Sequence, residues 1–189
     1  MASPLPPPDE SAPELAAVLA EIRASRGIVS SVMQSLAHSP EGLRRFAQLG
    51  EYARYGSSLS DRRRELVILL TGRGVPYAWA HHAPIGRRAG LTDAELDAIR
   101  AGEVPSTFDA ADAALARVVL TLGPGKSVPD AVFGEARRYL SPREISDAVM
   151  IAAFFIMVAT IISAMRIELE ESDVIAAELE RQRARDAGY

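Results

Sequence analysis

The stretch from residue 148 to residue 165, AVMIAAFFIMVATIISAM, contains no charged side chain and constrains the fold more than any other segment. It falls just short of the roughly 20 apolar residues that a membrane-spanning helix needs. Before it, Ser141-Pro142-Arg143-Glu144 supplies an N-cap, a first-turn proline and a third-position glutamate, as at the start of a helix in a soluble protein. A helix that is apolar all round must be buried all round. We therefore expect burial in the core or against neighbouring copies of the chain, with membrane contact as the alternative.

The composition of the 189-residue chain is that of an ordinary soluble protein, with 48% hydrophobic and 24% charged residues. The net charge of −4 offers no basic field for nucleic acid. Cysteine is absent, which excludes disulfides, thiolate metal sites, Fe–S clusters and thiol-based catalysis. We therefore expect no nucleic-acid partner, and the apolar run favours copies of the chain itself over a membrane. A small-molecule substrate is expected only from the family resemblance given below.

Residues 1–12 are rich in proline and lack the basic and apolar regions of a signal peptide. We expect a flexible N-terminal tail and a cytoplasmic protein. Helical spacing of apolar residues runs through nearly all of the remaining chain, without a convincing strand or a long linker. This pattern predicts one all-α domain over residues 13–189, a helical bundle. The expected helices cover residues 13–25, 28–37, 40–55, 62–70, 77–88, 92–101, 109–122, 127–140 and 142–165, with a charged, surface-helical tail over 170–187.

The most informative segment for chemistry is residues 62–91, because it holds Glu65 within an apolar helix and the adjacent pair His81 and His82. A partly buried carboxylate suits a general acid or base, and histidine can move a proton at physiological pH. Neighbouring helical residues point about 100° apart, so at most one of the two histidines shares a pocket with Glu65. The alternatives are a surface ion pair of Glu65 with a preceding arginine, and hydrogen-bonded structural histidines.

Two aromatic residues, Tyr77 and Trp79, precede these histidines and either fill the core or line a pocket. The third histidine, His38, lies at a predicted helix end, where it would interact with the helix dipole. Acidic residues are scattered without metal-ligand spacing. We therefore expect no metal site and no cofactor.

The order of these motifs resembles the carboxymuconolactone decarboxylase family, which includes the alkylhydroperoxidase D-like proteins. The resemblance covers about residues 36–169 and includes LAHSPEGLRRF, RRELVILL, YAWAHHAPIGRRAGLTDAELDAI and FDAADAAL. It implies an all-α, obligately oligomeric fold, from dimer to hexamer. It also aligns the family glutamate with Glu65 and the family histidine with His82.

Members without cysteine are linked to cofactor-free decarboxylation of lactone acids and to related lyase or isomerase steps. The resemblance therefore implies that His82 stabilises a developing oxyanion while Glu65 moves a proton. Tyr77, Trp79 and His81 would line the substrate site. Arg73, in a glycine-flanked loop, could hold a substrate carboxylate.

The chain departs from the family pattern at Val75 and Ala78, where the peroxidase branch has its two cysteines. Without a thiol, the peroxide chemistry of that branch cannot operate. Ala78 also lacks the glutamate that cysteine-free relatives often have. A non-catalytic oligomeric binding or scaffold protein of the same fold is therefore the alternative to a lyase or isomerase.

Overall fold

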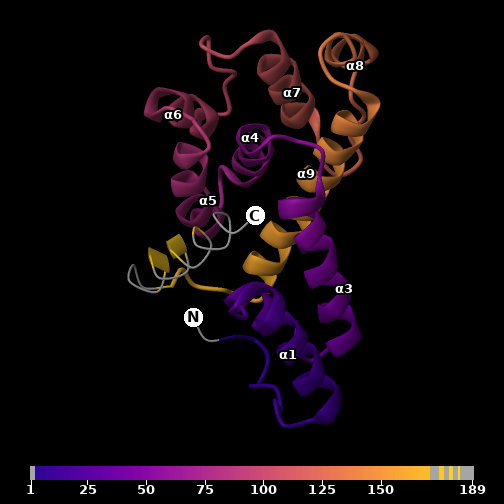
Figure 1. Cartoon of the computed structure of the whole chain (residues 1–189), viewed down its shortest axis with the longest axis vertical. Coiled ribbons are helices and arrows are strands. Elements are labelled where there is room, and N and C mark those ends of the chain that lie inside the picture. The colour runs from indigo at the N-terminus through magenta and orange to yellow at the C-terminus, as the bar shows by residue number, and fades with distance from the viewer. Residues whose placement is uncertain (1–2, 171–174, 177–178, 181–182, 184–189) are drawn as a thin grey trace. The chain divides into compact units, whose positions relative to one another are not determined.

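The computed structural model describes residues 3–170, 175–176, 179–180 and 183 (Figure 1). Within these residues every regular element is helical and no strand occurs, which confirms the predicted all-α class. The chain divides into two compact units, one made of residues 1–52 and 160–189 and the other of residues 53–159. The single domain over residues 13–189 and the flexible tail over residues 1–12 stay predictions. Most of the predicted tail helix over 170–187 lies outside the described residues.

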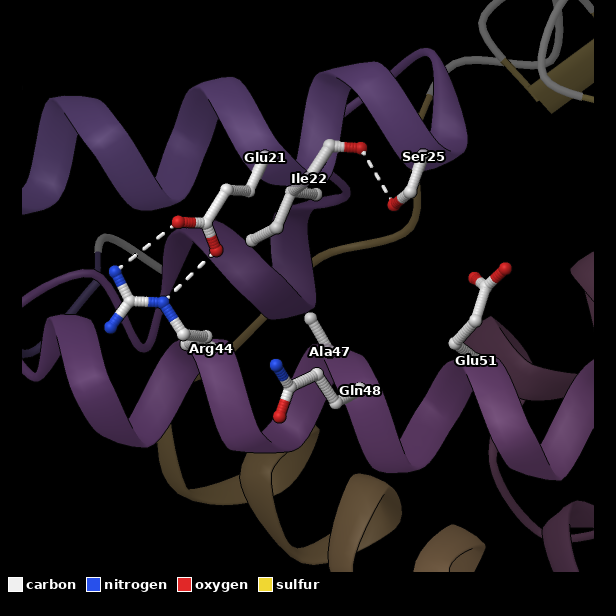
Figure 2. Close-up of a pocket in the computed structure, with 7 residues that line it drawn as sticks. All are labelled: Glu21, Ile22, Ser25, Arg44, Ala47, Gln48 and Glu51. Atoms are coloured by element: carbon white, nitrogen blue, oxygen red, sulfur yellow. Dashed lines mark hydrogen bonds and ion pairs between the residues drawn. The ribbon is translucent and has the colours of Figure 1, made fainter.

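The first unit is built around α1 (Pro13–Arg26) and α3 (Pro40–Glu51), which pack against each other. Helix α1 buries Leu15, Val18, Leu19 and Ile22 along one stripe. Figure 2 shows the facing side of the pair, where Arg44 of α3 forms an ion pair with Glu21 of α1. A cavity of about 300 Å³ opens beside this pair, lined by Glu21, Ile22, Ser25, Arg44, Ala47, Gln48 and Glu51.

The helix predicted over residues 28–37 is wrong in its extent, because only α2 (Ser31–Gln34) forms. The Ser30 side chain accepts the N–H of Met33, so Ser30 is the N-cap and the preceding residues stay extended. After Gln34 the chain continues in tight turns, in which the Ala37 N–H donates to the Gln34 carbonyl. The prediction placed a helix in the right part of the chain but did not identify Ser30 as the residue at which it starts.

The helix predicted over residues 40–55 also differs, since α3 ends at Glu51 and a short π-helix, η1 (Tyr52–Gly56), follows. A π-helix inserts an extra residue into the turn, and such turns occur frequently at functional sites. The hydrophobic spacing of the sequence does not distinguish the two helix types. Arg54 lies in this π-turn.

The second unit contains α4 (Asp61–Gly72), α5 (Pro76–Arg88), α6 (Asp93–Ala101), α7 (Ala110–Thr121), α8 (Asp130–Ala136) and most of α9 (Pro142–Ala164). Helix α4 packs against α5, α6 and α7. The predicted capping box at Thr92 is confirmed, because its side chain accepts the Glu95 N–H and Glu95 accepts the Thr92 N–H. Ser141 and Glu144 form the same reciprocal cap before α9.

Helix α8 is shorter than the predicted segment over residues 127–140. Pro129 precedes its first residue, and a proline disfavours helical backbone at the residue before it, so the helix cannot begin earlier. Its last turn tightens after Ala136, where the Tyr139 N–H donates to the Ala136 carbonyl. The segment from Arg137 to Leu140 is therefore a turn that leads to the start of α9.

Helix α9 contains the apolar run that opened the sequence analysis. Among the described helices it is the one that is long and apolar enough to cross a membrane, and 44% of its most apolar stretch is buried. Core helices of soluble proteins have the same length and composition. Ile151, Ala152 and Phe155 are buried, whereas Met157 is 38% exposed. The unit thus covers only part of the apolar surface of this helix.

Candidate functional site

Helix α4 places Glu65 in the interior of the second unit. Ser60 caps the helix by accepting the Arg63 N–H, which fixes where the first turn begins. From Glu65 onward six consecutive residues are buried, and the Glu65 side chain itself is only 1% exposed. The alternative of a surface position for this carboxylate is therefore excluded, and its charge must be met by neighbouring groups.

Helix α5 carries both histidines close to α4. Pro76 occupies its first turn, and the helix continues through Pro84 to Arg88. At Gly86 an added Cβ would lie 2.9 Å from Cδ1 of Leu69, so only a glycine permits this close approach of α5 to α4. The predicted divergence of the two histidines follows, because His82 points to Glu65 and His81 turns back along its own helix.

The central contact of the site joins Nδ1 of His82 to Oε2 of Glu65 at 2.9 Å. Both side chains are buried, and His82 is 7% exposed. The ring of Phe155, from α9, meets the His82 ring edge to face with 5.1 Å between centroids. A hydrogen bond on one side and an aromatic ring on the other therefore fix the orientation of the imidazole.

The charge of His82 follows from its surroundings. Burial lowers the pKa of His82, and the nearby charge of Arg54 lowers it further, while Glu65 acts in the opposite direction. The imidazole is therefore neutral at pH 7. With Glu65 as the acceptor, Nδ1 carries the hydrogen and Nε2 carries the lone pair. Nε2 makes no hydrogen bond to any residue that the structure describes.

Two further predicted site residues, His81 and Tyr77, contact each other. Nδ1 of His81 donates to the Tyr77 carbonyl at 2.8 Å, and the two rings stack with centroids 4.4 Å apart. Both residues are buried beside the Glu65–His82 pair along the same helix. Their predicted role in substrate binding stays a prediction.

Trp79 and Arg73 have contacts of their own. The guanidinium of Arg100 lies 5.1 Å from the centre of the Trp79 ring. Arg73 is exposed, and its Nη1 donates to the Leu70 carbonyl at 2.7 Å. Within the described residues neither side chain contacts Glu65 or His82. The roles predicted for both in substrate binding stay predictions.

Two arginines that were not predicted as site residues interact with the pair, one by an ion pair and one through its charge. Nε of Arg64 is 3.9 Å from Oε1 of Glu65, and the Arg54 charge acts on His82. The arginine run before Glu65 could have indicated Arg64, which the sequence suggested only as a surface partner. No sequence signal indicated Arg54, because the π-turn that places it is not visible in the hydrophobic pattern.

The other two arginines of this run hold the helices of the second unit together. Nε of Arg62 and Nε of Arg63 each donate to Asp112 at 2.9 Å. Arg62 also binds Glu95, and Arg63 binds Glu144. Burial raises the pKa of Glu95, but hydrogen bonds from Arg62, Thr92 and Thr107 outweigh it and lower that pKa to about 2. This cluster joins α4, α6, α7 and α9.

Metal binding finds no support at this point of the molecule. Among the described residues, no three side chains of histidine, aspartate or glutamate gather closely enough to hold a metal ion. Val75 and Ala78 occupy the positions at which the peroxidase branch has cysteines. Val75 is the extended residue that precedes α5, and Ala78 is buried. The carboxylate and the imidazole of the Glu65–His82 pair are groups that can transfer a proton.

Part of the chain matches a known protein family. The model of the carboxymuconolactone decarboxylase family matches residues 40–119, a range that contains both Glu65 and His82. No curated protein matches the chain.

Solved structures share the fold at low sequence identity. The debrominase Bmp8 is 16% identical, with a TM-score of 0.70 over 96% of this chain and 97% of its own. An alkylhydroperoxidase AhpD core from Ralstonia eutropha is 18% identical, with a TM-score of 0.72 over 90% and 94%. A peroxidase-related protein from Silicibacter is 19% identical, with a TM-score of 0.69 over 89% and 91%. The fold is thus that of the AhpD-like proteins, and residues 40–119 match the model of the carboxymuconolactone decarboxylase family, in a chain without cysteine.

Proposed function

We propose that the protein is a cofactor-independent lyase or isomerase in which Glu65 and His82 transfer a proton on a small carboxylated, lactone or aromatic-derived substrate. The observation that carries this proposal is the 2.9 Å hydrogen bond between the two buried side chains, which leaves Nε2 of His82 with its lone pair. Glu65 holds the ring in one tautomer and would stabilise the imidazolium that forms when Nε2 takes up a proton.

The chemistry is that of an enolate intermediate. In an isomerisation, Nε2 of His82 removes a proton from the carbon beside a carbonyl group, and the electron pair of that bond moves to the carbonyl oxygen. The imidazolium then returns the proton at another carbon of the conjugated system. In a decarboxylation, the bond to the leaving CO₂ supplies the electron pair, and the carbon takes its proton from an imidazolium that has bound the one proton from solution which the reaction consumes.

The lowered pKa of His82 supports the role of a base better than that of a resting acid. A neutral imidazole can accept a proton at pH 7 without first losing one. The imidazolium, once formed, is a stronger acid than free histidine and returns the proton readily. Both properties favour a reaction in which a proton is removed and replaced within one turnover.

The similar structures support a small substrate. One of them is a variant of the debrominase Bmp8 in complex with 2,3,4-tribromopyrrole, a small halogenated aromatic ring, with a TM-score of 0.71 to this chain. Because the chain has no cysteine, thiol chemistry is excluded here, and only the size and planarity of such a ligand are relevant.

We also infer that the protein assembles with copies of itself through α9. Val149, Ala153 and Ile156 line a cavity of about 260 Å³ together with Leu122, Gly123 and Pro124. Met157 extends this apolar surface and is exposed. An apolar face of this kind is typical of a protein interface. In sedimentation velocity, Met157→Glu should lower the degree of association whereas Met157→Leu should preserve it. Equal association states would contradict this interface.

The proton transfer can be tested by exchange with solvent. Small carboxylated lactones and aromatic acids are incubated with the protein in D₂O, and deuterium incorporation at carbon is followed by NMR. Substitution His82→Ala should lower the exchange rate by about 10²–10⁴-fold, and Glu65→Gln should lower it because the imidazolium loses its counter-charge. The exposed His38 offers the matched control, and His38→Ala should exchange at the wild-type rate. If both site variants keep the full rate, the assignment is wrong.

A folded protein that exchanges none of these substrates would favour the alternative of a non-catalytic binding or scaffold protein. The loss of functional side chains at Val75 and Ala78 motivates that alternative. The burial of Glu65 argues against it, because an unused carboxylate would be more stable in contact with water.

A further inference from the structure

Helices α8 and α9 form a surface groove of about 600 Å³ in the second unit, and the proposed proton transfer does not use it. Its apolar wall is made of Phe133, Ile145, Val149, Met150 and Ala153. Ala153 is exposed, and Phe133, Val149 and Met150 are only half-buried. An apolar surface of this extent that stays in contact with water is typical of a place where another molecule binds.

Two side chains of opposite charge line the α8 side of this groove. Asp130 is the first residue of α8, and Arg137 directly follows its last residue. This spacing makes almost two full helical turns, so the two residues lie on one face of α8 and about 10 Å apart along its axis. Both are exposed, and neither side chain forms an ion pair or a hydrogen bond with any residue that the structure describes.

The opposite face of α8 differs from the groove face in this respect. There Glu135 binds Arg117 of α7, with 2.9 Å between Oε1 and Nη1, where α7 and α8 pack together. The charge on the face toward α7 is therefore paired within the chain, whereas Asp130 and Arg137 on the groove face are not. Charges that border an apolar groove and have no internal partner can pair with charges of a bound molecule.

The apolar surface of α9 continues beyond this groove. Val149 and Ala153 also line the cavity of about 260 Å³ that Leu122, Gly123 and Pro124 border on the other side of α9. Met157, one helical turn after Ala153, is exposed on the same face. An exposed helix ridge between two grooves is the surface against which another helix packs, with its own ridge in one of the grooves. A small ligand in one groove would leave the rest of this surface in water.

We propose that the α8–α9 groove binds the same groove of a second copy of the chain, about a twofold axis that makes the two α8 helices antiparallel. In a twofold interface each surface is its own partner, so Asp130 faces Arg137 of the partner subunit and the reverse pair forms as well. One negative and one positive charge on the same helix face are self-complementary in this arrangement, whereas a uniformly acidic or basic partner would meet a like charge. The proposal rests on the self-association inferred under the proposed function, and adds the α8 surface and its charge pairing.

Charge reversal tests this pairing by sedimentation velocity over a range of protein concentrations. Asp130→Arg and Arg137→Asp each replace two ion pairs by two contacts between like charges, and each should weaken association about 10-fold or more. The variant with both substitutions restores opposite charges and should associate within about 3-fold of the wild type. Asp97→Arg is the matched control, because Asp97 is an exposed residue of α6 outside the groove and the change in net charge is the same. This control should associate as the wild type does.

Thiol cross-linking supplies a second readout that needs no charge reversal, because the chain has no cysteine of its own. Asp130→Cys and Arg137→Cys are prepared separately, mixed and treated with a short bismaleimide. Since the twofold arrangement places one thiol opposite the other, the mixture should give several-fold more covalent dimer than either variant alone. A mixture of Asp97→Cys and Arg137→Cys is the control and should give little.

Three results would overturn the proposed interface. The first is a wild-type protein that stays monomeric at the highest concentration measured. The second is a folded double-reversal variant that associates no better than the two single reversals. The third is a mixture of Asp130→Cys and Arg137→Cys that yields no more covalent dimer than the control mixture.

The variant Met157→Glu separates this proposal from the self-association inferred through α9 alone. If Met157→Glu lowers association while both charge reversals associate as the wild type does, the α9 surface stands and the α8 groove fails. If Met157→Glu associates normally while the double reversal rescues the single ones, the α8 groove stands and the surface at Met157 fails. Deuterium exchange at the Glu65–His82 pair tests the proton transfer independently of both.

Discussion

The first turns of α4 carry two charged clusters that differ in how completely their hydrogen bonds are satisfied. Arg62 and Arg63 share Asp112, and their remaining donors reach Glu95 and Glu144. On the other side Glu65 binds His82, but Nε of Arg64 has no acceptor and Nε2 of His82 is left with a lone pair. We call Arg62, Arg63, Glu95, Asp112 and Glu144 the scaffold cluster, and we call it closed because Nε of both its arginines has an acceptor. The site cluster is open, because Nε of Arg64 has none among the described residues.

This difference in hydrogen bonding distinguishes arginines that stabilise the fold from an arginine at the candidate site, although all three are adjacent in the sequence. A closed cluster can only hold helices together, because a ligand would have to break an existing bond to join it. An open cluster in a buried position is unfavourable until a ligand completes it, which is expected of a binding or catalytic site. The three adjacent arginines have the same chemistry, so only their partners distinguish the two roles.

The largest effect on stability is expected in the scaffold cluster. Asp112→Ala removes the acceptor that Arg62 and Arg63 share, and leaves two guanidinium groups facing each other. Breaking a buried pair costs about 3–5 kcal/mol, and since both arginines keep some contact with water we expect a loss of about 2–3 kcal/mol. Urea unfolding measures this loss.

Asp93→Ala is the matched control, because that aspartate forms an exposed pair with Arg87. Its unfolding midpoint should lie near the wild-type value. If Asp112→Ala unfolds at the same urea concentration as this control, the cluster does not hold the helices.

The second effect concerns the site cluster. Glu65→Ala leaves Nδ1 of the buried His82 without an acceptor, at a cost of about 1–3 kcal/mol in the free energy of unfolding. Glu65→Gln keeps an acceptor oxygen and should retain most of the stability while it loses proton transfer. If Glu65→Gln is as unstable as Glu65→Ala, the charge of Glu65 stabilises the fold and the cluster is not an open one.

Much of the fold could be predicted from the sequence because its signals are local. The uncharged run over 148–165 and the Ser141 and Thr92 caps depend only on neighbouring residues, and the structure contains all of them. The extents of α2 and α8 were wrong because one cap and one proline outweigh the hydrophobic spacing. The π-turn at Arg54 has no signature of its own in the pattern.

The site was predictable in part for the same reason. Glu65 and the pair His81 and His82 were singled out from the sequence itself, and the resemblance to a family then selected His82. The structure joins Glu65 and His82 by a hydrogen bond. Arg73 was chosen for its glycine-flanked loop, but its position along the chain says nothing about the distance to His82. The charge of Arg54, which lies in η1, acts on His82 of α5, and arguments from single residues of the sequence do not capture such an effect between separate elements.

The two clusters should also respond to pH in different ranges. Burial lowers the pKa of His82 below its usual 6.5. As the pH falls, the imidazole of the unfolded chain therefore binds a proton at a higher pH than the imidazole of the folded chain does. Stability from the site cluster is therefore complete above pH 6.5 and is lost as the pH falls below it. The pKa of Glu95 falls from 4.5 to about 2, so stability from the scaffold cluster is complete above pH 4.5 and is lost between pH 4.5 and 2.

Unfolding in urea at a series of pH values from 8 to 3 resolves the two ranges. His82→Gln should remove the decline that begins near pH 6.5 and leave the decline below pH 4.5 unchanged, whereas Glu95→Gln should do the reverse. A decline near pH 6.5 that persists in His82→Gln would mean that another group titrates there, and the neutral imidazole of the site would lose its support.

The smallest effect is expected from the ion pair between α1 and α3 in Figure 2, which is the exposed counterpart of both clusters. The Glu21 side chain is 55% exposed, and Arg44 also pairs with Glu41, so each charge has water or a second partner when the other is removed. Glu21→Ala should therefore leave the thermal midpoint within experimental error, at low and at high salt alike. If Glu21→Ala instead destabilises the protein as much as Asp112→Ala does, burial and complete hydrogen bonding do not determine which ion pairs of this molecule contribute most to its stability.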